Sequence, residues 1–273
     1  MIKKIQMIKK SLSVKWLIFK SGVEKFVVKS FPIFVPSSAG NYKIQGFHTI
    51  IGINTLFILI TKILQNLKIN VKIININKFK NNSNAKKLKY LFNKYGSDKS
   101  KIHNYHLIYG SLFRKIKNVK KILEIGLGTN NENIISNMGS KGYPGASIRA
   151  FRDFFNKATI YGADIDKNIL FNETRIKTFV ADQTNLNDLK NIFKKTKGNY
   201  DLIIDDGLHA PYANVSVIIV TLKYLKKEGY LIIEDIPFKA KPIWEVISNI
   251  LNKKYNTFLV KTKKNYVFII KKI

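Results

Sequence analysis

The 273-residue sequence contains no cysteine. This absence excludes a disulfide framework, a thiolate zinc site and a cysteine nucleophile, and it fits a protein of the reducing cytoplasm. Arginine is also scarce, because only four of the 48 basic residues are arginines: Arg114, Arg149, Arg152 and Arg175. Arginine is the residue best suited to bidentate contacts with phosphates and guanine. Its scarcity argues against sequence-specific nucleic-acid binding, despite a formal net charge of +31.

Acidic residues are almost absent from the first 120 positions. Only Glu24 and Asp98 lie there, whereas the other 15 of the 17 acids follow. Residues 1–80 hold 14 lysines against that single glutamate. The asymmetry predicts two regions, namely a basic N-terminal appendage over residues 1–80 and a separate domain over residues 86–273.

Within the basic region, residues 44–61 carry no charge. The stretch approaches the length of a membrane span, but polar residues dilute it: Gln45, His48, Thr49, Asn54 and Thr55. The dilution favours a helix that packs on the protein or makes peripheral contact with a membrane surface over one that spans the membrane. Residues 68–77 then alternate like a strand, and the polar segment 78–87 has the composition of a linker.

From residue 121 onward, short apolar segments alternate with segments of helical spacing. We expect strands over residues 121–126, 158–165, 175–182, 200–206 and 229–235, with helices between them and another after the last. Alternation of this kind predicts an α/β fold with a doubly wound, mostly parallel sheet covered on both faces. The final apolar segments, 256–262 and 265–272, are joined so closely that they must form an antiparallel hairpin.

The expected strand ends carry the groups most suited to ligand binding, because open α/β sheets bind ligands beyond the carboxyl ends of their strands. After residues 121–126, Gly126 and Gly128 let the backbone approach a ligand, and Glu124 suits a cationic or hydroxyl group. Asp164 ends the next strand, where an acid accepts hydrogen bonds from both hydroxyls of a ribose. It lies 38 residues beyond Gly126, whereas the dinucleotide fingerprint places this acid roughly 20 residues on.

Asp182 and Gln183 end the third expected strand and suit the edge of an adenine. Any one acid at such a position is readily explained as a solvated loop residue or a helix cap. Seven acids lie at the expected strand ends: Glu124, Asp164, Asp182, Asp205, Asp206, Glu234 and Asp235. In a lysine-dominated chain, the joint occurrence of all seven at such positions is hard to explain by solvated loops or helix caps.

Asp205-Asp206 and Glu234-Asp235 end two strands that we expect to be neighbours. Four carboxylates at close range repel one another unless a cation lies between them. Oxygen ligands without cysteine suit Mg²⁺ or a similar hard metal. His209 is the only histidine after residue 106, and imidazole is suited to act as a general base near neutral pH. The alternative for His209 is a capping or surface role.

A series of motifs between residues 90 and 235 resembles one enzyme family. The segments GSDKSKIHNYH, ILEIGLG, GASIRAFRDFF, IYGADID, RIKTFVADQT, YDLIIDDGLHA and GYLIIED are similar in content and order to the metal-dependent sugar O-methyltransferases of macrolide and related antibiotic pathways. The terminal hairpin also resembles the end of a class I, Rossmann-like methyltransferase sheet. The resemblance implies an enzyme that methylates a hydroxyl of a sugar or glycan-like small molecule.

The resemblance also implies which residues form the site. S-adenosylmethionine would bind near Glu124, Gly126, Gly128, Ser147, Asp164, Asp182 and Gln183. Mg²⁺ would be held partly by Asp206 and Asp235, with His209 as the base.

Two alternatives stay open. A nucleic-acid methyltransferase would exploit the positive charge, but residues 205–209 read Asp-Asp-Gly-Leu-His where such enzymes usually carry an Asp/Asn-Pro-Pro-aromatic motif. A non-catalytic, membrane-associated scaffold is favoured if residues 1–80 dominate the function. The sequence does not indicate an oligomeric state.

Overall fold

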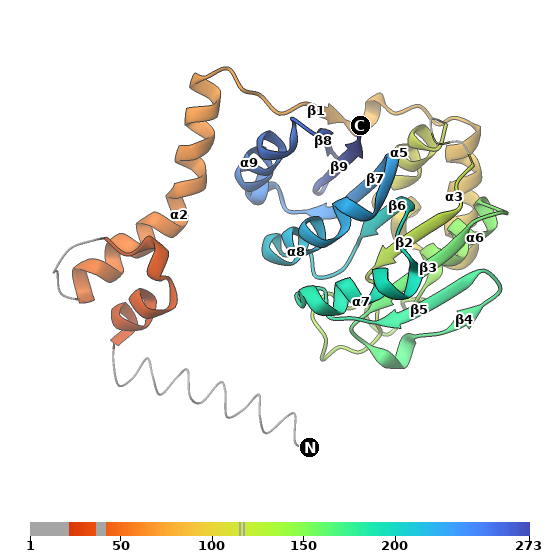
Figure 1. The fold of residues 1–273 in the computed structure, drawn as a ribbon, viewed down its shortest axis with the longest axis horizontal. Helices are drawn as coiled ribbons and strands as arrows, with labels where there is room; N and C mark the ends of the chain where they lie inside the picture. The colour runs from red at the N-terminus through yellow and green to blue at the C-terminus, as the bar shows by residue number, and fades with distance from the viewer. Residues whose placement is uncertain (1–21, 37–41, 115, 117) are drawn as a thin grey trace. The chain divides into compact units, whose positions relative to one another are not determined.

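The computed structural model describes residues 22–36, 42–114, 116 and 118–273. The chain divides into two compact units, Met1–Ile69 and Asn70–Ile273 (Figure 1). In the first unit, residues 22–30 are helical and precede a short 3₁₀ turn, η1 (Pro32–Phe34), and the long helix α2 (Tyr42–Asn66). A Cβ at Gly46 of α2 would lie 2.8 Å from Glu24 Cα, so this glycine allows the 22–30 helix to pack closely on α2.

The second unit is built on one nine-stranded sheet. Its strands are β1 (Ile73–Asn75), β2 (Lys121–Ile125), β3 (Thr159–Asp164), β4 (Asn172–Glu173), β5 (Ile176–Val180), β6 (Tyr200–Asp205), β7 (Leu225–Ile236), β8 (Tyr255–Lys261) and β9 (Tyr266–Lys272). They lie in the order β1-β8-β9-β7-β6-β2-β3-β5-β4. Strands β7, β6, β2, β3 and β5 are parallel, and β9 lies antiparallel between β7 and β8. The predicted doubly wound, mostly parallel sheet with a terminal antiparallel hairpin is confirmed.

The boundary between the units falls earlier than the linker expected over residues 78–87. It lies after Ile69 because β1 belongs to the sheet, where it pairs in parallel with β8. Part of the expected linker is also helical, since Asn82 caps the helix that starts at Ser83 by accepting a 3.0 Å hydrogen bond from the Ala85 N–H.

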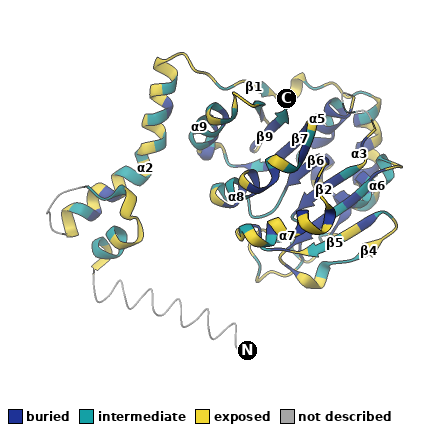
Figure 2. Ribbon diagram, in the orientation of Figure 1, coloured by how far each residue is buried: buried dark blue, intermediate teal, exposed yellow. Residues whose placement is uncertain are grey.

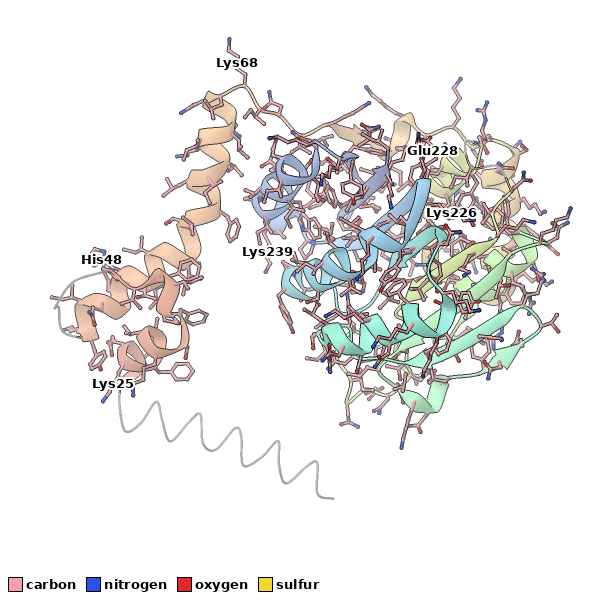
Figure 3. All side chains as sticks on the ribbon, viewed as in Figure 1. Lys25, His48, Lys68, Lys226, Glu228 and Lys239 are labelled. Atoms are coloured by element: carbon pink, nitrogen blue, oxygen red, sulfur yellow. The ribbon has the colours of Figure 1, made fainter. Side chains whose placement is uncertain are left out.

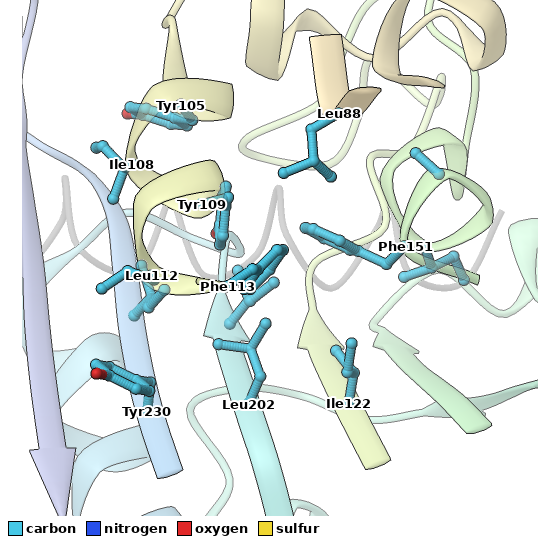
Figure 4. Packing of buried hydrophobic residues seen from close by; sticks show 14 of the residues in the cluster. Leu88, Tyr105, Ile108, Tyr109, Leu112, Phe113, Ile122, Phe151, Leu202 and Tyr230 are labelled. Atoms are coloured by element: carbon cyan, nitrogen blue, oxygen red, sulfur yellow. The ribbon is translucent and has the colours of Figure 1, made fainter. Parts of the chain in front are cut away.

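Helices cover both faces of the sheet. They are α3 (Ser83–Tyr95), α4 (Asp98–Lys101), α5 (Tyr105–Leu112), α6 (Ala146–Phe154), α7 (Leu186–Thr196), α8 (Pro211–Thr221) and α9 (Lys241–Leu251), with 3₁₀ turns η2 (Ile76–Lys78), η3 (Lys167–Ile169), η4 (Leu222–Tyr224) and η5 (Phe238–Ala240). Residues of α3, α5 and α6 share one apolar core, and residues of α7, α8 and α9 share the other. Figure 4 shows Leu88, Tyr109 and Phe151 of the first core above the strand residues Ile122 and Leu202.

The central strands are buried on both faces, which explains their continuous apolar runs (Figure 2). Ile122 faces the first core, whereas the next residue, Leu123, faces the second. The same alternation holds for Leu202 and Ile203 on β6. Only the strand ends and the loops beyond them are left for polar chemistry.

Candidate active site

The glycines after β2 bring two strand ends together. Gly126 and Gly128 have φ angles of +92° and +76°, in the left-handed region that favours glycine. A Cβ at Gly126 would lie 2.1 Å from the carbonyl oxygen of Asp206. No other residue fits there without displacing the backbone that follows β6.

A cavity of about 370 Å³ lies beyond the ends of β2, β3 and β5. Its size suits a small-molecule ligand. Five of the residues predicted to bind S-adenosylmethionine line it: Gly126, Gly128, Asp164, Asp182 and Gln183. We call it the first cavity.

Backbone N–H groups fix Asp164 in this cavity. One carboxylate oxygen accepts a 2.7 Å hydrogen bond from the Leu127 N–H, and the other accepts one of 2.9 Å from the Asp166 N–H. Asp182 is held in a similar way, because its Oδ1 accepts 2.7 Å bonds from the N–H and the hydroxyl of Thr184. Both carboxylates are therefore oriented before any ligand binds.

Gln183 lines the first cavity and forms hydrogen bonds with the end of β6 and the loop that follows it. Its Nε2 donates a 2.6 Å hydrogen bond to Asp205, and its Oε1 accepts one of 2.7 Å from the Leu208 N–H. Asp205 is fully buried and also accepts a bond from Asn214. Burial raises the pKa of Asp205 to about 6. With its oxygens occupied in this way, Asp205 braces the loop after β6.

Glu124 and Ser147 do not line the first cavity. Glu124 has no exposed surface, and it accepts a 2.7 Å hydrogen bond from the Ser147 hydroxyl. Ser147 instead lines a second cavity of about 430 Å³, which also contains Asp206, His209 and Asp235. Of the seven predicted residues, Glu124 and Ser147 thus lie outside the first cavity, and Ser147 shares the second with Gly126 and Gly128.

A buried lysine lies among the acids of the second cavity. Lys99 belongs to α4 and is 2% exposed. Its Nζ lies 2.7 Å from Asp206 Oδ2 and 3.2 Å from Glu124 Oε1, and it also pairs with Glu234. The charge repulsion predicted among these carboxylates is thus partly relieved by a side chain. Lys99 lies 107 residues before Asp206. Its sequence signals were the surplus of acids and its place in the segment GSDKSKIHNYH.

The electrostatics of this ion cluster are set by burial and by charge together. Burial disfavours the ammonium form of Lys99, but Asp206, Glu234 and Glu124 outweigh burial and raise its pKa well above the ordinary value. Burial also raises the pKa of Glu234 well above its usual range, and the nearby carboxylates of Asp206 and Asp235 add to this. Lys99 therefore stays charged, while Glu234 takes up a proton more readily than an exposed glutamate.

Asp206, His209 and Asp235 converge as the sequence predicts. One potential ligand atom from each lies within 4.8 Å of the others, and all three side chains are half-buried. His209 Nε2 lies 4.0 Å from Asp206 Oδ1. His209 and Asp235 both have φ angles of +55°, a backbone conformation that is uncommon outside glycine and often marks functional sites.

Three side chains that the sequence did not mark as site residues hold Asp235. The Tyr105 hydroxyl donates a 2.6 Å hydrogen bond to Asp235 Oδ1, and the Asn265 amide donates another to the same oxygen. His103 Nδ1 lies 3.3 Å from that oxygen, and its Nε2 lies 3.4 Å from Asp98. Burial disfavours a charged His103, but hydrogen bonding to Asp98 and the charge of Asp235 prevail and raise its pKa.

The chemistry of this donor set fits a hard divalent cation. Asp206 offers Oδ1 on the side of His209, because Lys99 binds its other oxygen. Glu124, Asp206, Glu234 and Asp235 supply four carboxyl groups, and Lys99 pairs with three of them. Carboxylate oxygens are the ligands that Mg²⁺ prefers. Asp206 and Asp235 are the best placed among the described residues, since neither is fully buried.

The two cavities adjoin one another. Both are lined by Gly126, Gly128, Ser136 and Asp206. The first cavity has the fixed acids and glycines, whereas the second has the carboxylate cluster, His209 and a tyrosine from the 129–144 loop, Tyr143. A ligand in one cavity would therefore meet a ligand in the other beside Asp206.

Comparison with known proteins gives sequence relatives of one kind. The chain is 28% identical over 153 residues to the 8-demethyl-8-alpha-L-rhamnosyl tetracenomycin-C 2'-O-methyltransferase of Streptomyces olivaceus, covering 56% of this chain and 38% of that protein. It is 30% identical over 149 residues to the demethylmacrocin O-methyltransferase of Streptomyces fradiae, covering 54% and 34%. The chain thus spans little more than a third of these relatives' length. No protein-family model matches it.

A solved structure supports the fold. The MycE methyltransferase from the mycinamycin biosynthetic pathway, in complex with Mg and SAH, aligns with a TM-score of 0.55 and 24% identity over 68% of this chain and 54% of that one. The sheet order, the glycine-lined strand end and these relatives agree with one another. The chain therefore has the class I S-adenosylmethionine-dependent methyltransferase fold, and it resembles the sugar O-methyltransferases of macrolide pathways.

Proposed function

We propose that this protein is an S-adenosylmethionine-dependent O-methyltransferase that acts on a hydroxyl of a sugar or glycan-like small molecule. The observation that carries the proposal is the junction of the two cavities at Gly126, Gly128, Ser136 and Asp206. Methyl transfer requires a sulfonium and a hydroxyl to be held in line at near-attack distance. Two adjoining cavities, one suited to a nucleoside and one rich in carboxylates, meet this requirement. The relatives' names describe O-methyltransferases, one of them for a rhamnosyl compound.

The first cavity would hold the methyl donor. Asp164 is oriented to accept hydrogen bonds from ribose hydroxyls, and Asp182 and Gln183 lie where an adenine edge would bind. Gly126 and Gly128 leave room for the ligand against the backbone. In this proposal Glu124 and Ser147 contribute from the side of the second cavity, because Ser147 lines that cavity and donates a hydrogen bond to Glu124.

The second cavity would bind the acceptor. Asp206 and Asp235 would hold a Mg²⁺ ion, which makes a nearby hydroxyl more acidic. His209 then removes the proton from that hydroxyl, since its Nε2 faces Asp206 in the cavity. Lys99 holds Asp206 in place, and Tyr105 with Asn265 holds Asp235. The methyl group passes to the hydroxyl oxygen and leaves S-adenosylhomocysteine.

Two measurements on the full chain test the proposal. Calorimetry with S-adenosylmethionine should show one site per chain, and a mass-shift assay with labelled cofactor should show a gain of one methyl group on a glycosylated acceptor. Cofactor binding without methyl transfer to any acceptor would indicate a protein that binds the cofactor but is not an enzyme. No cofactor binding at all would support the non-catalytic scaffold. Label found in RNA or DNA instead would support the nucleic-acid alternative.

Substitutions test the assigned roles. Asp206→Ala and His209→Ala should each lower turnover by about 10³-fold or more, because base and metal contributions are of this order. Cofactor affinity should change little in either variant. Glu245→Gln removes an acid that pairs with Lys241 on α9 and serves as the matched control with full activity. Full activity of Asp206→Ala, or of the wild type in a strong chelator, would refute the metal assignment.

A further inference from the structure

Helix α2 is poorly covered by the other described residues of its unit, 22–36 and 67–69. It is 25 residues long, and among the described residues it is the helix long and apolar enough to cross a membrane. Only 11% of its most apolar 18-residue window is buried. A core helix of a soluble domain would be mostly covered, as α8 is by the sheet. Figure 2 shows exposed positions along the length of α2.

The exposed apolar side chains surround most of the helix. At 3.6 residues per turn they cover about two thirds of its circumference. They are Phe47, Ile50, Ile51, Leu56, Ile58, Leu59 and Ile63, each between 41% and 62% exposed. The remaining arc includes Gly46, which approaches Glu24. An amphipathic surface helix would carry a broad polar face, and α2 has none.

The polar residues of α2 are largely satisfied by the helix itself. Thr49, Asn54 and Thr55 each donate to the carbonyl four residues earlier, at 2.7, 2.8 and 2.7 Å, and Thr61 donates to that of Ile58 at 2.8 Å. In hydrocarbon, the cost of a polar group comes mainly from a hydrogen bond left unmade. These residues therefore make the stretch less apolar in composition, but they add little to the free energy of transferring the helix into hydrocarbon.

The charges at the ends of the stretch fit a bilayer. Residues 44–61 span about 27 Å as a helix, close to the roughly 30 Å of a hydrocarbon core. Lys43 and Lys62 bound this stretch, and residues 1–80 hold 14 lysines against one acid. Lysines near a helix end reach the headgroup layer and attract anionic lipids. Figure 3 shows the Lys25 and Lys68 side chains on the surface of this unit.

From these observations we infer that α2 inserts into a lipid bilayer, with residues 44–61 in the hydrocarbon and the flanking lysines at anionic headgroups. This attaches the protein to the membrane by an embedded helix, not merely by surface charge. The inference is independent of the proposed methyltransferase activity. It reverses the preference for a peripheral helix that the sequence composition indicates.

Vesicle flotation of the full chain tests the insertion. The protein should float with phosphatidylcholine vesicles that contain phosphatidylglycerol and remain bound at about 1 M salt, where the Debye length is only about 3 Å. Release by salt would show a purely electrostatic contact and overturn the inference. A discrete oligomer in solution that ignores vesicles would overturn it too, because a second copy would then cover α2.

Matched substitutions separate insertion from general stickiness. Ile51→Lys places a charge near the middle of the exposed arc and should weaken vesicle partition by roughly 100-fold. Ile51→Leu should bind as the wild type does. Ile250→Lys changes an isoleucine of α9 in the other unit that is more exposed than Ile51, 72% against 41%, and should leave partition unchanged. Equal binding by Ile51→Lys and the wild type would refute insertion, with S-adenosylmethionine affinity measured alongside to show that the second unit is folded.

Discussion

Acidic residues end the strands on both sides of β2, but their partners differ. On the β3 and β5 side, Asp164 and Asp182 accept hydrogen bonds from backbone N–H groups. On the β6 and β7 side, Asp206 and Asp235 are bound by the side chains of other elements. The first arrangement fixes a carboxylate by the course of the backbone. The second balances charge, and it depends on what other elements bring to the site.

The largest effect on stability is expected at the side-chain end of this comparison. Lys99→Met removes the ammonium from among Asp206, Glu234 and Glu124 and should lower the free energy of unfolding by about 3–5 kcal/mol, the usual cost of breaking a buried ion pair. Urea unfolding measures this. Lys226→Met breaks the more exposed pair with Asp201 and should cost about 1 kcal/mol or less. Equal losses in the two variants would mean that the burial of the Lys99 ion cluster adds nothing to its contribution to stability.

The backbone-held side should respond in ligand affinity. Asp164→Asn keeps one oxygen for the two backbone donors, Leu127 and Asp166, and loses the charge. S-adenosylmethionine affinity should fall about 10- to 100-fold, in line with about 1.5–3 kcal/mol for a charged hydrogen bond. Mg²⁺ affinity, measured by calorimetry on the same samples, should not change. A parallel loss of Mg²⁺ affinity would mean that the cofactor site and the metal site are coupled, which would contradict this prediction.

Metal affinity should depend on the residues that orient Asp235. Tyr105→Phe removes the 2.6 Å hydrogen bond to Asp235 Oδ1 and should weaken Mg²⁺ binding about 10-fold, because groups that orient metal ligands commonly contribute this much. Tyr95→Phe removes a hydroxyl bound to Asp153, outside both cavities, and is the matched control. If both variants bind Mg²⁺ as the wild type does, the support of Asp235 does not matter for the metal.

The smallest effect concerns Asp205, which lies beside Asp206 and is likewise bound by side chains, those of Gln183 and Asn214. Its pKa is raised to about 6, against 3.8 for an ordinary aspartate. A raised pKa means that the native state binds the proton more tightly, so this contribution to stability is full below 3.8 and is lost as the pH rises through 6. Lowering the pH from 7 to 5 should therefore stabilise the wild type by about 1 kcal/mol relative to Asp205→Asn. Parallel unfolding curves of the two proteins at both pH values would contradict this.

Sequence periodicity predicted most of the second unit, because each central strand is an uninterrupted apolar run between turns. β4 was not predictable, since two exposed residues show no pattern. β1 was recognised as strand-like, but its place in the sheet was not, because a three-residue edge strand gives no signal of its partner.

Some site residues were predictable from the sequence, whereas the side chains that bind them from other elements were not. Glycines and acids at strand ends were predictable, since their position in the chain fixes their position in the sheet. Lys99 and Tyr105 lie in the segment GSDKSKIHNYH, but their contacts with the acids were not predictable, because these contacts form by packing across more than a hundred residues. Asn265 reaches Asp235 through the β8–β9 turn, which gave no signal either. Helix α2 shows a different limit of composition. Thr49 and Asn54 are polar, but each donates a hydrogen bond to a carbonyl of its own helix, which lowers the cost of placing them in an apolar environment.

Lys99 has one more consequence. Because its ammonium is covalently part of the chain, one positive charge can never diffuse away from the carboxylates. A site neutralised only by free ions would come apart whenever the ions were withdrawn. We therefore expect the domain to stay folded but inactive when Mg²⁺ is removed, and to regain activity without refolding when Mg²⁺ is added back. Thermal melting in a strong chelator should accordingly fall by only a few degrees, even where turnover stops.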